Sequence, residues 1–178
     1  MRSSCASTLL TAVALACASG AAAVDMNPRL QPLAHLVGKT WKGTVSPPGA
    51  AKPAVDVSRF ELALNGQAVR NRHSIDDGAY GGETFILWEE AKQSLVYYYF
   101  TTAGFYTTGT MKAVDGALES HEIVKGAAGG IAEVKATHRL LPDGRLQVTS
   151  RYLKNGVWED GRETLYVEDP QAVVRFKE

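Results

Sequence analysis

Two of the four histidines stand where residue alternation would carry them toward the interior of a β-structure. His73 shares a predicted strand face with Ile75, and His138 shares one with Val134. A histidine in that position can polarise a ligand, act as a general acid or base, or coordinate a metal or haem iron. It can equally be a structural residue whose ring nitrogens bond neighbouring hydroxyls or carbonyls. Without a third ligand, an H-E-x-x-H motif or a Cys–His cluster, the pair predicts no metal site.

The stretch LVYYYFTTAGFYTTGTM, residues 95–111, is rich in tyrosine and threonine. Alternation puts Tyr97 and Tyr99 on one face, and on a later strand it turns Tyr152 inward. A tyrosine joins a large apolar ring to a hydroxyl that needs a partner when buried. These residues therefore predict a cavity wall that stacks on a ligand and hydrogen-bonds it, whereas β-propensity and core packing are the structural alternative. The predicted ligand-binding residues are His73, His138, Tyr97, Tyr99 and Tyr152.

Aromatic residues on both faces of 94–102 predict that this strand is covered on both sides.

The remaining cations are predicted to lie outside such a cavity. Alternation turns Arg70 and Arg72 away from the interior and makes His121 an exposed residue. His35 is expected to cap the N-terminal segment or to face solvent.

No catalytic residue is predicted. The pairs Asp76-Asp77 and Glu89-Glu90 are adjacent in sequence, so strand geometry would point their members to opposite faces. The chain contains no G-x-S-x-G, Walker or G-x-G-x-x-G motif.

Turn-forming residue pairs recur along the sequence and define the strands that carry these residues. Pairs such as Asn65-Gly66 and Asp115-Gly116 recur about a dozen residues apart and supply the positive φ of tight hairpins. Hairpin-joined strands form a meander, and an open meander of ten strands would leave two exposed edges. We expect an all-β fold, a single up-and-down antiparallel β-barrel of about ten strands, with a two-sheet sandwich as the alternative. The strand-like runs are TWKGTVS, VSRFELAL, QAVRNRHSI, ETFILWEE, SLVYYYFTT, FYTTGTMKAV, ALESHEIVK, AEVKATHRLL, RLQVTSRYLK and RETLYV, and Gly81-Gly82 and Gly129-Gly130 are expected to be hairpin bends.

The first residues differ in composition from the rest. Residues 1–23 hold one cation, Arg2, then a short apolar run and a small-residue end, which predicts a secretory signal peptide cleaved near Ala23. The mature protein would be periplasmic or secreted. The alternative is a lipoprotein anchored to the membrane through Cys17, because VALAC loosely matches a lipidation box.

The mature chain is predicted to have two parts. Residues 24–38 form a short helical segment with Asn27 as its cap, and Pro32 limits it to separate turns. Residues 39–178 form the barrel domain, in which Trp41 is expected to plug the floor.

Composition excludes some classes of function. With 19 basic and 19 acidic residues among 178, the chain lacks the basic excess of a nucleic-acid-binding protein. Both cysteines, Cys5 and Cys17, lie in the predicted signal peptide, so the barrel has no disulfide and depends on packing.

The sequence also carries a resemblance. LAHLVGKTWKG resembles the opening of calycin-type barrels, and NGQAVRNRHS followed by YGGETFILWEEAKQSLVYYYFTTAGFYTTGTM is similar to a bacterial family of unknown function described as lipocalin-like. The resemblance spans roughly residues 30–168. Nitrobindin-like barrels of similar architecture hold haem through a histidine near the C-terminus, but RETLYVEDPQAVVRFKE contains none, so that ligand does not carry over.

The sequence therefore favours an exported calycin-like barrel that binds a small apolar or amphipathic molecule. One alternative is a haem-dependent or isomerase-type enzyme that uses His73 or His138 in the same cavity. Another is an envelope scaffold or interaction protein with a filled barrel. No cofactor is predicted for the binding protein, with haem as the candidate in the enzyme alternative.

Overall fold

The computed structural model describes residues 24–46, 52–126 and 129–177, and these form a closed barrel of ten antiparallel strands. Each strand pairs with its neighbours in sequence, and β1 closes on β10 with Trp41 opposite Glu168. The predicted up-and-down barrel is confirmed, and the sandwich alternative is wrong. The strands are β1 (Thr40–Val45), β2 (Ala54–Ala63), β3 (Ala68–Ile75), β4 (Tyr80–Glu89), β5 (Ser94–Thr101), β6 (Tyr106–Val114), β7 (Ala117–Lys125), β8 (Ile131–Leu140), β9 (Leu146–Lys154) and β10 (Val157–Glu168).

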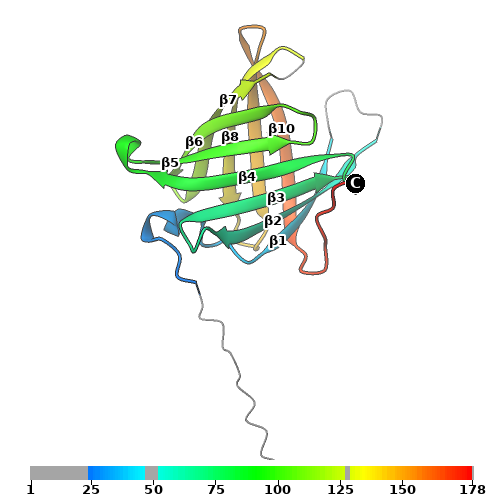
Figure 1. The fold of residues 1–178 in the computed structure, drawn as a ribbon. Helices are drawn as coiled ribbons and strands as arrows, with labels where there is room; N and C mark the ends of the chain where they lie inside the picture. The colour runs from blue at the N-terminus through cyan, green and yellow to red at the C-terminus, as the bar shows by residue number, and fades with distance from the viewer. Residues whose placement is uncertain (1–23, 47–51, 127–128, 178) are drawn as a thin grey trace, which may run out of the picture.

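The barrel is strongly twisted. In Figure 1, β2 to β5 run across the view, whereas β7 to β10 rise steeply. Strand twist produces this crossing, because a closed sheet must tilt its strands about the barrel axis. The inner faces of the two groups therefore face each other across the interior of the barrel.

Several strands extend beyond the predicted runs. β2 begins at Ala54 and β10 at Val157, earlier than the apolar alternation indicates. Gly81 and Gly82 lie inside β4 and not in a bend, which corrects the prediction for that pair. Gly82 faces the interior, where its missing side chain leaves space for the Tyr99 ring, whereas Gly81 faces outward beside Phe176.

The N-terminal segment closes one end of the barrel. A 3-10 helix, η1 (Pro28–Leu33), begins after Asn27, whose side chain accepts a hydrogen bond of 2.9 Å from the Arg29 amide. Leu30 and Leu33 of this segment are fully buried in the same core cluster as Trp41. Burying such side chains stabilises the fold by roughly 1.5–3 kcal/mol each. Trp41 thus lies in the floor of the barrel, as predicted.

The C-terminal residues return along the outside of the barrel. Beyond β10, the Arg175 amide donates a hydrogen bond of 3.0 Å to Ser74 Oγ, and the Arg72 guanidinium lies 5.2 Å from the centre of the Phe176 ring.

A second short helix, η2 (Glu90–Lys92), forms the β4–β5 connection. No helix among the described residues is long and apolar enough to cross a membrane.

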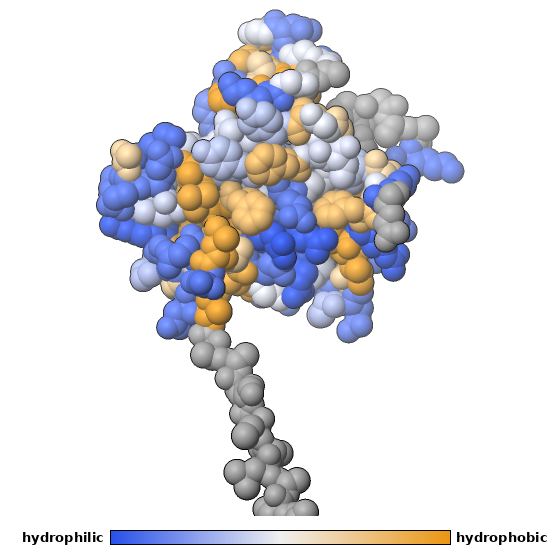
Figure 2. All heavy atoms as spheres, in the orientation of Figure 1, coloured by the Kyte–Doolittle hydropathy of each residue, from blue (hydrophilic) through white to orange (hydrophobic). Residues whose placement is uncertain are grey.

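The outer face of β5 is covered at Val96 but open at its aromatic residues, so the prediction of cover on both sides is wrong for these. Tyr98, Phe100 and Tyr106 are 42%, 52% and 44% exposed, and the rings of Phe100 and Tyr106 stack with centroids 6.1 Å apart. Hydrophobic patches lie among polar side chains on the face of the molecule that carries β2 to β5 (Figure 2). Only the inner aromatic residues of this strand are enclosed.

Candidate functional site

A cavity of about 640 Å³ occupies the interior of the barrel. All five residues predicted to bind a ligand line this one cavity: His73, His138, Tyr97, Tyr99 and Tyr152. Its volume falls within the range of roughly 300–1,000 Å³ typical of small-molecule sites. The floor side is apolar, with Phe60, Ile86, Met111 and Val148 among the lining residues. Charged and hydroxyl groups gather in other parts of the wall.

Glycines on the wall make room for the tyrosines. A Cβ added to Gly43 on β1 would lie 2.7 Å from Tyr166 Cδ1, because the Tyr166 ring of β10 lies over that glycine. The ring therefore spans a whole strand, and its hydroxyl donates a hydrogen bond of 2.7 Å to Asp56 Oδ2 on β2. Asp56 is only 6% exposed, and this contact lies within the barrel core.

A second tyrosine crosses β4 in the same way. The Tyr99 ring of β5 lies over Gly82, where an added Cβ would be 2.6 Å from Cε2. The Tyr99 hydroxyl lies 2.7 Å from His73 Nε2 on β3, and His73 Nδ1 lies 3.1 Å from Asp56 Oδ1. Tyr99 also bonds the Tyr80 hydroxyl at 3.1 Å. Asp56, His73, Tyr99 and Tyr80 thus form one chain of hydrogen bonds.

A third tyrosine crosses β6. The Tyr97 ring lies over Gly109, where an added Cβ would be 2.5 Å from Tyr97 Cζ. The hydroxyl reaches Glu122 on β7 and donates a bond of 3.1 Å to Oε2, which also accepts one of 3.1 Å from Thr107. Burial raises the pKa of Glu122, although both hydroxyl bonds oppose that rise. Burial also raises the pKa of Tyr97, and the neighbouring Glu122 carboxylate adds to the effect.

A β-bulge turns an arginine into the cavity. Pairing between β9 and β10 slips between Asp160 and Glu163, so two residues oppose Ser150. Arg162 is directed inward by this extra residue, and its Nε donates a bond of 3.2 Å to the Tyr152 hydroxyl. The Tyr152 ring lies over Gly161, where an added Cβ would be 2.7 Å from Cε2. Neither Nη1 nor Nη2 of Arg162 hydrogen-bonds another described residue, and neither is sealed off by protein atoms.

His138 lies apart from these chains. Its ring lines the cavity and makes no hydrogen bond to any described residue. Burial lowers the pKa of His138 to about 4, and a positive charge on His35 would lower it further. His35 is itself half-buried, and its Nε2 is enclosed without a partner among the described residues, so the predicted exposure to solvent is wrong. Its hydrogen bond with the Pro32 backbone agrees with the predicted capping of the N-terminal segment. The floor therefore holds both imidazoles in their neutral form at pH 7.

The outer cations lie where alternation placed them. Arg70 and Arg72 form ion pairs with Glu61 and Glu83 and do not line the cavity. His121 is exposed, and its Nε2 lies 2.6 Å from Glu133 Oε2.

Three charged residues of the cavity were not predicted from the sequence: Asp56, Glu122 and Arg162. Alternation could have found two of them, because Asp56 shares a strand face with Phe60, and Glu122 lies on the face opposite His121. Arg162 had no comparable signal. Its direction depends on the bulge at Gly161, which only the pairing of β9 with β10 reveals.

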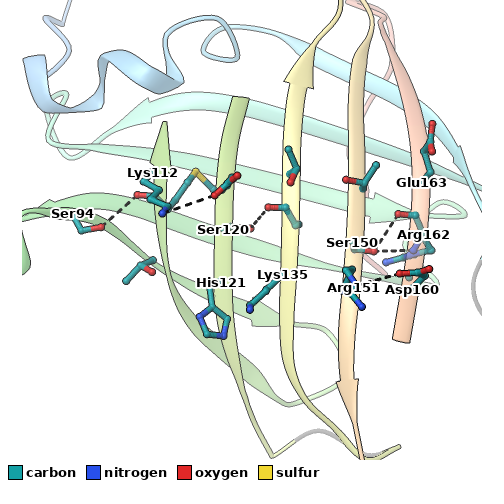
Figure 3. Close-up of a pocket in the computed structure, with 17 residues that line it drawn as sticks. Ser94, Lys112, Ser120, His121, Lys135, Ser150, Arg151, Asp160, Arg162 and Glu163 are labelled. Carbon is teal, nitrogen blue, oxygen red and sulfur yellow. Dashed lines mark hydrogen bonds and ion pairs between the residues drawn. The ribbon is translucent and has the colours of Figure 1, made fainter. Parts of the chain in front are cut away.

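A second hollow, of about 740 Å³, lies on the outside of β6 to β10. Figure 3 shows Lys112, His121 and Lys135 along this surface, with Arg151 paired to Asp160 at 3.2 Å. Its charged side chains are solvated, and such surface pairs contribute at most about 1 kcal/mol. The interior cavity is the better candidate site because several of its polar groups are desolvated and its wall is largely apolar.

The described residues contain no group of three or more His, Cys, Asp or Glu side chains that could hold a metal ion. No protein-family model and no curated protein matches the chain. Among solved structures, the crystal structure of Rv2717c from M. tuberculosis is similar, with a TM-score of 0.58 and 13% sequence identity over 82% of this chain and 99% of that one. At this identity the likeness shows the barrel fold alone.

Proposed function

We propose that this protein is an exported barrel that holds a small amphipathic molecule in its interior. The observation that carries the proposal is the 640 Å³ cavity, which has an apolar floor side and a separate group of desolvated polar side chains. A molecule with an apolar body and one polar end matches that division. The same cavity argues against the alternative of a filled barrel that acts only as a scaffold.

Arg162 supports a polar end that accepts hydrogen bonds. Its guanidinium is always ionised, and Asp56 nearby stabilises that charge. Asp56 already engages both of its oxygens, one with His73 and one with Tyr166. The terminal nitrogens of Arg162 therefore keep donors for a bound molecule, and a carboxylate or another strong acceptor would satisfy them.

Export is part of the proposal and rests on the N-terminal sequence. Residues 1–23, which include Cys17, lie outside the described residues. Their single cation, short apolar run and small-residue end support signal cleavage. A protein without disulfides can serve in that compartment because its barrel is closed and its floor is packed.

Native mass spectrometry of protein purified gently from its own cell envelope tests the proposal. We expect a reproducible extra mass that denaturation releases, and its fragmentation would name the ligand class. A protein that carries no extra mass, and that binds no amphiphile in a displacement assay with a fluorescent fatty-acid probe, would overturn the binding function. The same spectrum gives the mature mass and so distinguishes cleavage near Ala23 from lipidation at Cys17.

A further inference from the structure

Glu122 has the surroundings of a general base. Its Oε2 accepts hydrogen bonds from two neutral hydroxyls, Tyr97 and Thr107. Its Oε1 bonds no described residue and is not sealed by protein atoms, so it is open to the cavity that Glu122 lines. No cation bonds the carboxyl group among these residues. A partly desolvated carboxylate without a cation bonded to it is a stronger base than one in solution, and desolvation is the main cause of the raised pKa of Glu122.

The hydrogen-bonded series Asp56, His73, Tyr99 and Tyr80 can deliver a proton to the cavity. Asp56 orients His73 through Nδ1, His73 Nε2 contacts Tyr99, and Tyr99 contacts Tyr80. With a proton on Nε2, His73 can donate to Tyr99 and Tyr99 to Tyr80, so the Tyr80 O–H is left to donate into the cavity. Asp56 contacts His73 Nδ1 and fixes the orientation of the ring, as an aspartate does beside a catalytic histidine.

The base and the donor chain face each other within one cavity. Glu122, Tyr80 and Tyr99 all line it, and the negative charge of Glu122 helps to raise the pKa of both tyrosines, on which burial is the main effect. A raised pKa keeps both phenols protonated, so they remain donors at neutral pH. An acid and a base held apart, with their protons tuned by different surroundings, is the pattern of acid–base catalysis.

We propose that the cavity catalyses reversible enolisation of a bound carbonyl compound with an apolar body. Glu122 Oε1 takes the proton from the carbon next to the carbonyl, and that C–H electron pair forms the C=C bond of the enol. The carbonyl π pair moves to oxygen, which takes the proton of Tyr80. Tyr80 is reprotonated by Tyr99 and Tyr99 by His73. In the return step Glu122 gives its proton to carbon, while the enol O–H gives its proton back to Tyr80 and so through Tyr99 to His73. This regenerates a ketone or its isomer, without any oxidant or metal.

The inference rests on the proposed function, since the substrate is the ligand of the same cavity. It goes further in naming the substrate class, an enolisable ketone or aldehyde, and in giving roles to residues. Glu122 and Tyr80 contact the substrate, whereas Tyr99, His73 and Asp56 act through Tyr80.

The rate should depend on pH through Glu122. The groups facing its carboxyl are Tyr97 from β5, Thr107 from β6, and Tyr80 and Tyr99 across the cavity, with His121 on the outer face of its own strand. Because the carboxylate is the active form, the rate should rise with pH through a pKa above the ordinary value of 4.5.

The test is exchange of the α-hydrogens of 2-decanone in D₂O, followed by proton NMR with the full mature chain. We expect the protein to accelerate exchange and Glu122→Gln to slow it by about 10²–10⁴-fold, the usual contribution of a general base. Glu119→Gln is the matched control, since Glu119 lies on the outer face of the same strand beside Lys112. Tyr80→Phe should slow exchange by about 10²–10³-fold, the usual loss for one donor to a developing oxyanion, whereas Tyr98→Phe on the exposed face of β5 should not.

Ligand binding is measured in the same samples by saturation transfer from the protein to 2-decanone and to 2-decanol. If the ketone binds but exchanges at the buffer rate, or equally fast with Glu122→Gln, the enolisation proposal is overturned and the binding function stands. If neither compound binds, the proposed substrate class is wrong, and native mass spectrometry decides the binding function separately.

Discussion

Two acids of the cavity, Asp56 and Glu122, are bound in the same way by a tyrosine, but they differ in their other hydrogen-bond partners. Asp56 and Glu122 each receive the hydroxyl of a tyrosine that crosses a glycine on the strand between them. Asp56 engages both oxygens, and its partners include a histidine, with Arg162 nearby. Glu122 engages one oxygen with hydroxyls alone, and burial raises its pKa.

The difference shows that burial alone does not determine the chemistry of a carboxyl group. A buried acid with both oxygens bonded and cations close by is a fixed part of the structure. A buried acid with one free oxygen and neutral partners keeps the capacity to take up and release a proton. The barrel places one of each on opposite sides of its cavity.

The largest expected effect is on stability. Asp56→Ala removes the partner of both His73 and Tyr166, and we expect it to lower the free energy of unfolding by about 3 kcal/mol. Glu122→Gln keeps an acceptor for Tyr97 and should cost about 1 kcal/mol or less. Urea unfolding of both variants measures the comparison, and equal losses would contradict it.

A methyl group added at Gly109 should displace the Tyr97 ring that lies over this glycine. Gly109→Ala places a Cβ about 2.5 Å from both Tyr97 Cζ and the His121 carbonyl oxygen, so we expect a loss of roughly 1–3 kcal/mol from strain. The Tyr97–Glu122 bond should be lost as well. Gly116→Ala is a poor control because of its positive φ, so Ala113→Gly in the same strand serves instead. An unchanged Tyr97 environment by NMR would show that the wall adapts freely.

Arg162 should affect the binding of a carboxylate more than the binding of an alcohol. Arg162→Met should weaken binding of decanoate by about 10–100-fold and of decanol by much less, since the charge-assisted bonds of a carboxylate are lost. Arg151→Met, on the solvated outer side of the neighbouring strand, is the control. Isothermal titration calorimetry gives both affinities. Equal weakening of acid and alcohol would show that Arg162 acts through the shape of the cavity.

The smallest effect is a pH dependence of stability. The folded pKa of Glu122 lies above its ordinary value of 4.5, so the folded state binds the proton more tightly than the unfolded chain. Its contribution to stability is complete below pH 4.5 and is lost as pH rises through the folded pKa. Glu122→Gln lacks this loss, so its stability relative to the parent should rise with pH over that range. Unfolding curves at several pH values test this, and a constant difference would contradict it.

The sequence by itself determined the barrel and much of the inner wall. Turn residues such as Asn65-Gly66 and a period of two are local features, so they predicted ten strands and the inward faces without knowledge of pairing. For the same reason all five predicted residues line one cavity. Asp56 and Glu122 obey the same alternation, and attention to every inward position would have found them.

Only the tertiary structure decided how these residues meet. A tyrosine that reaches an acid two strands away depends on which glycine lies between them, and that is set by strand register. The direction of Arg162 depends on a bulge, and the burial of His35 depends on how the N-terminal segment docks against the barrel. These contacts join residues far apart in the chain, so no local pattern of residue types encodes them.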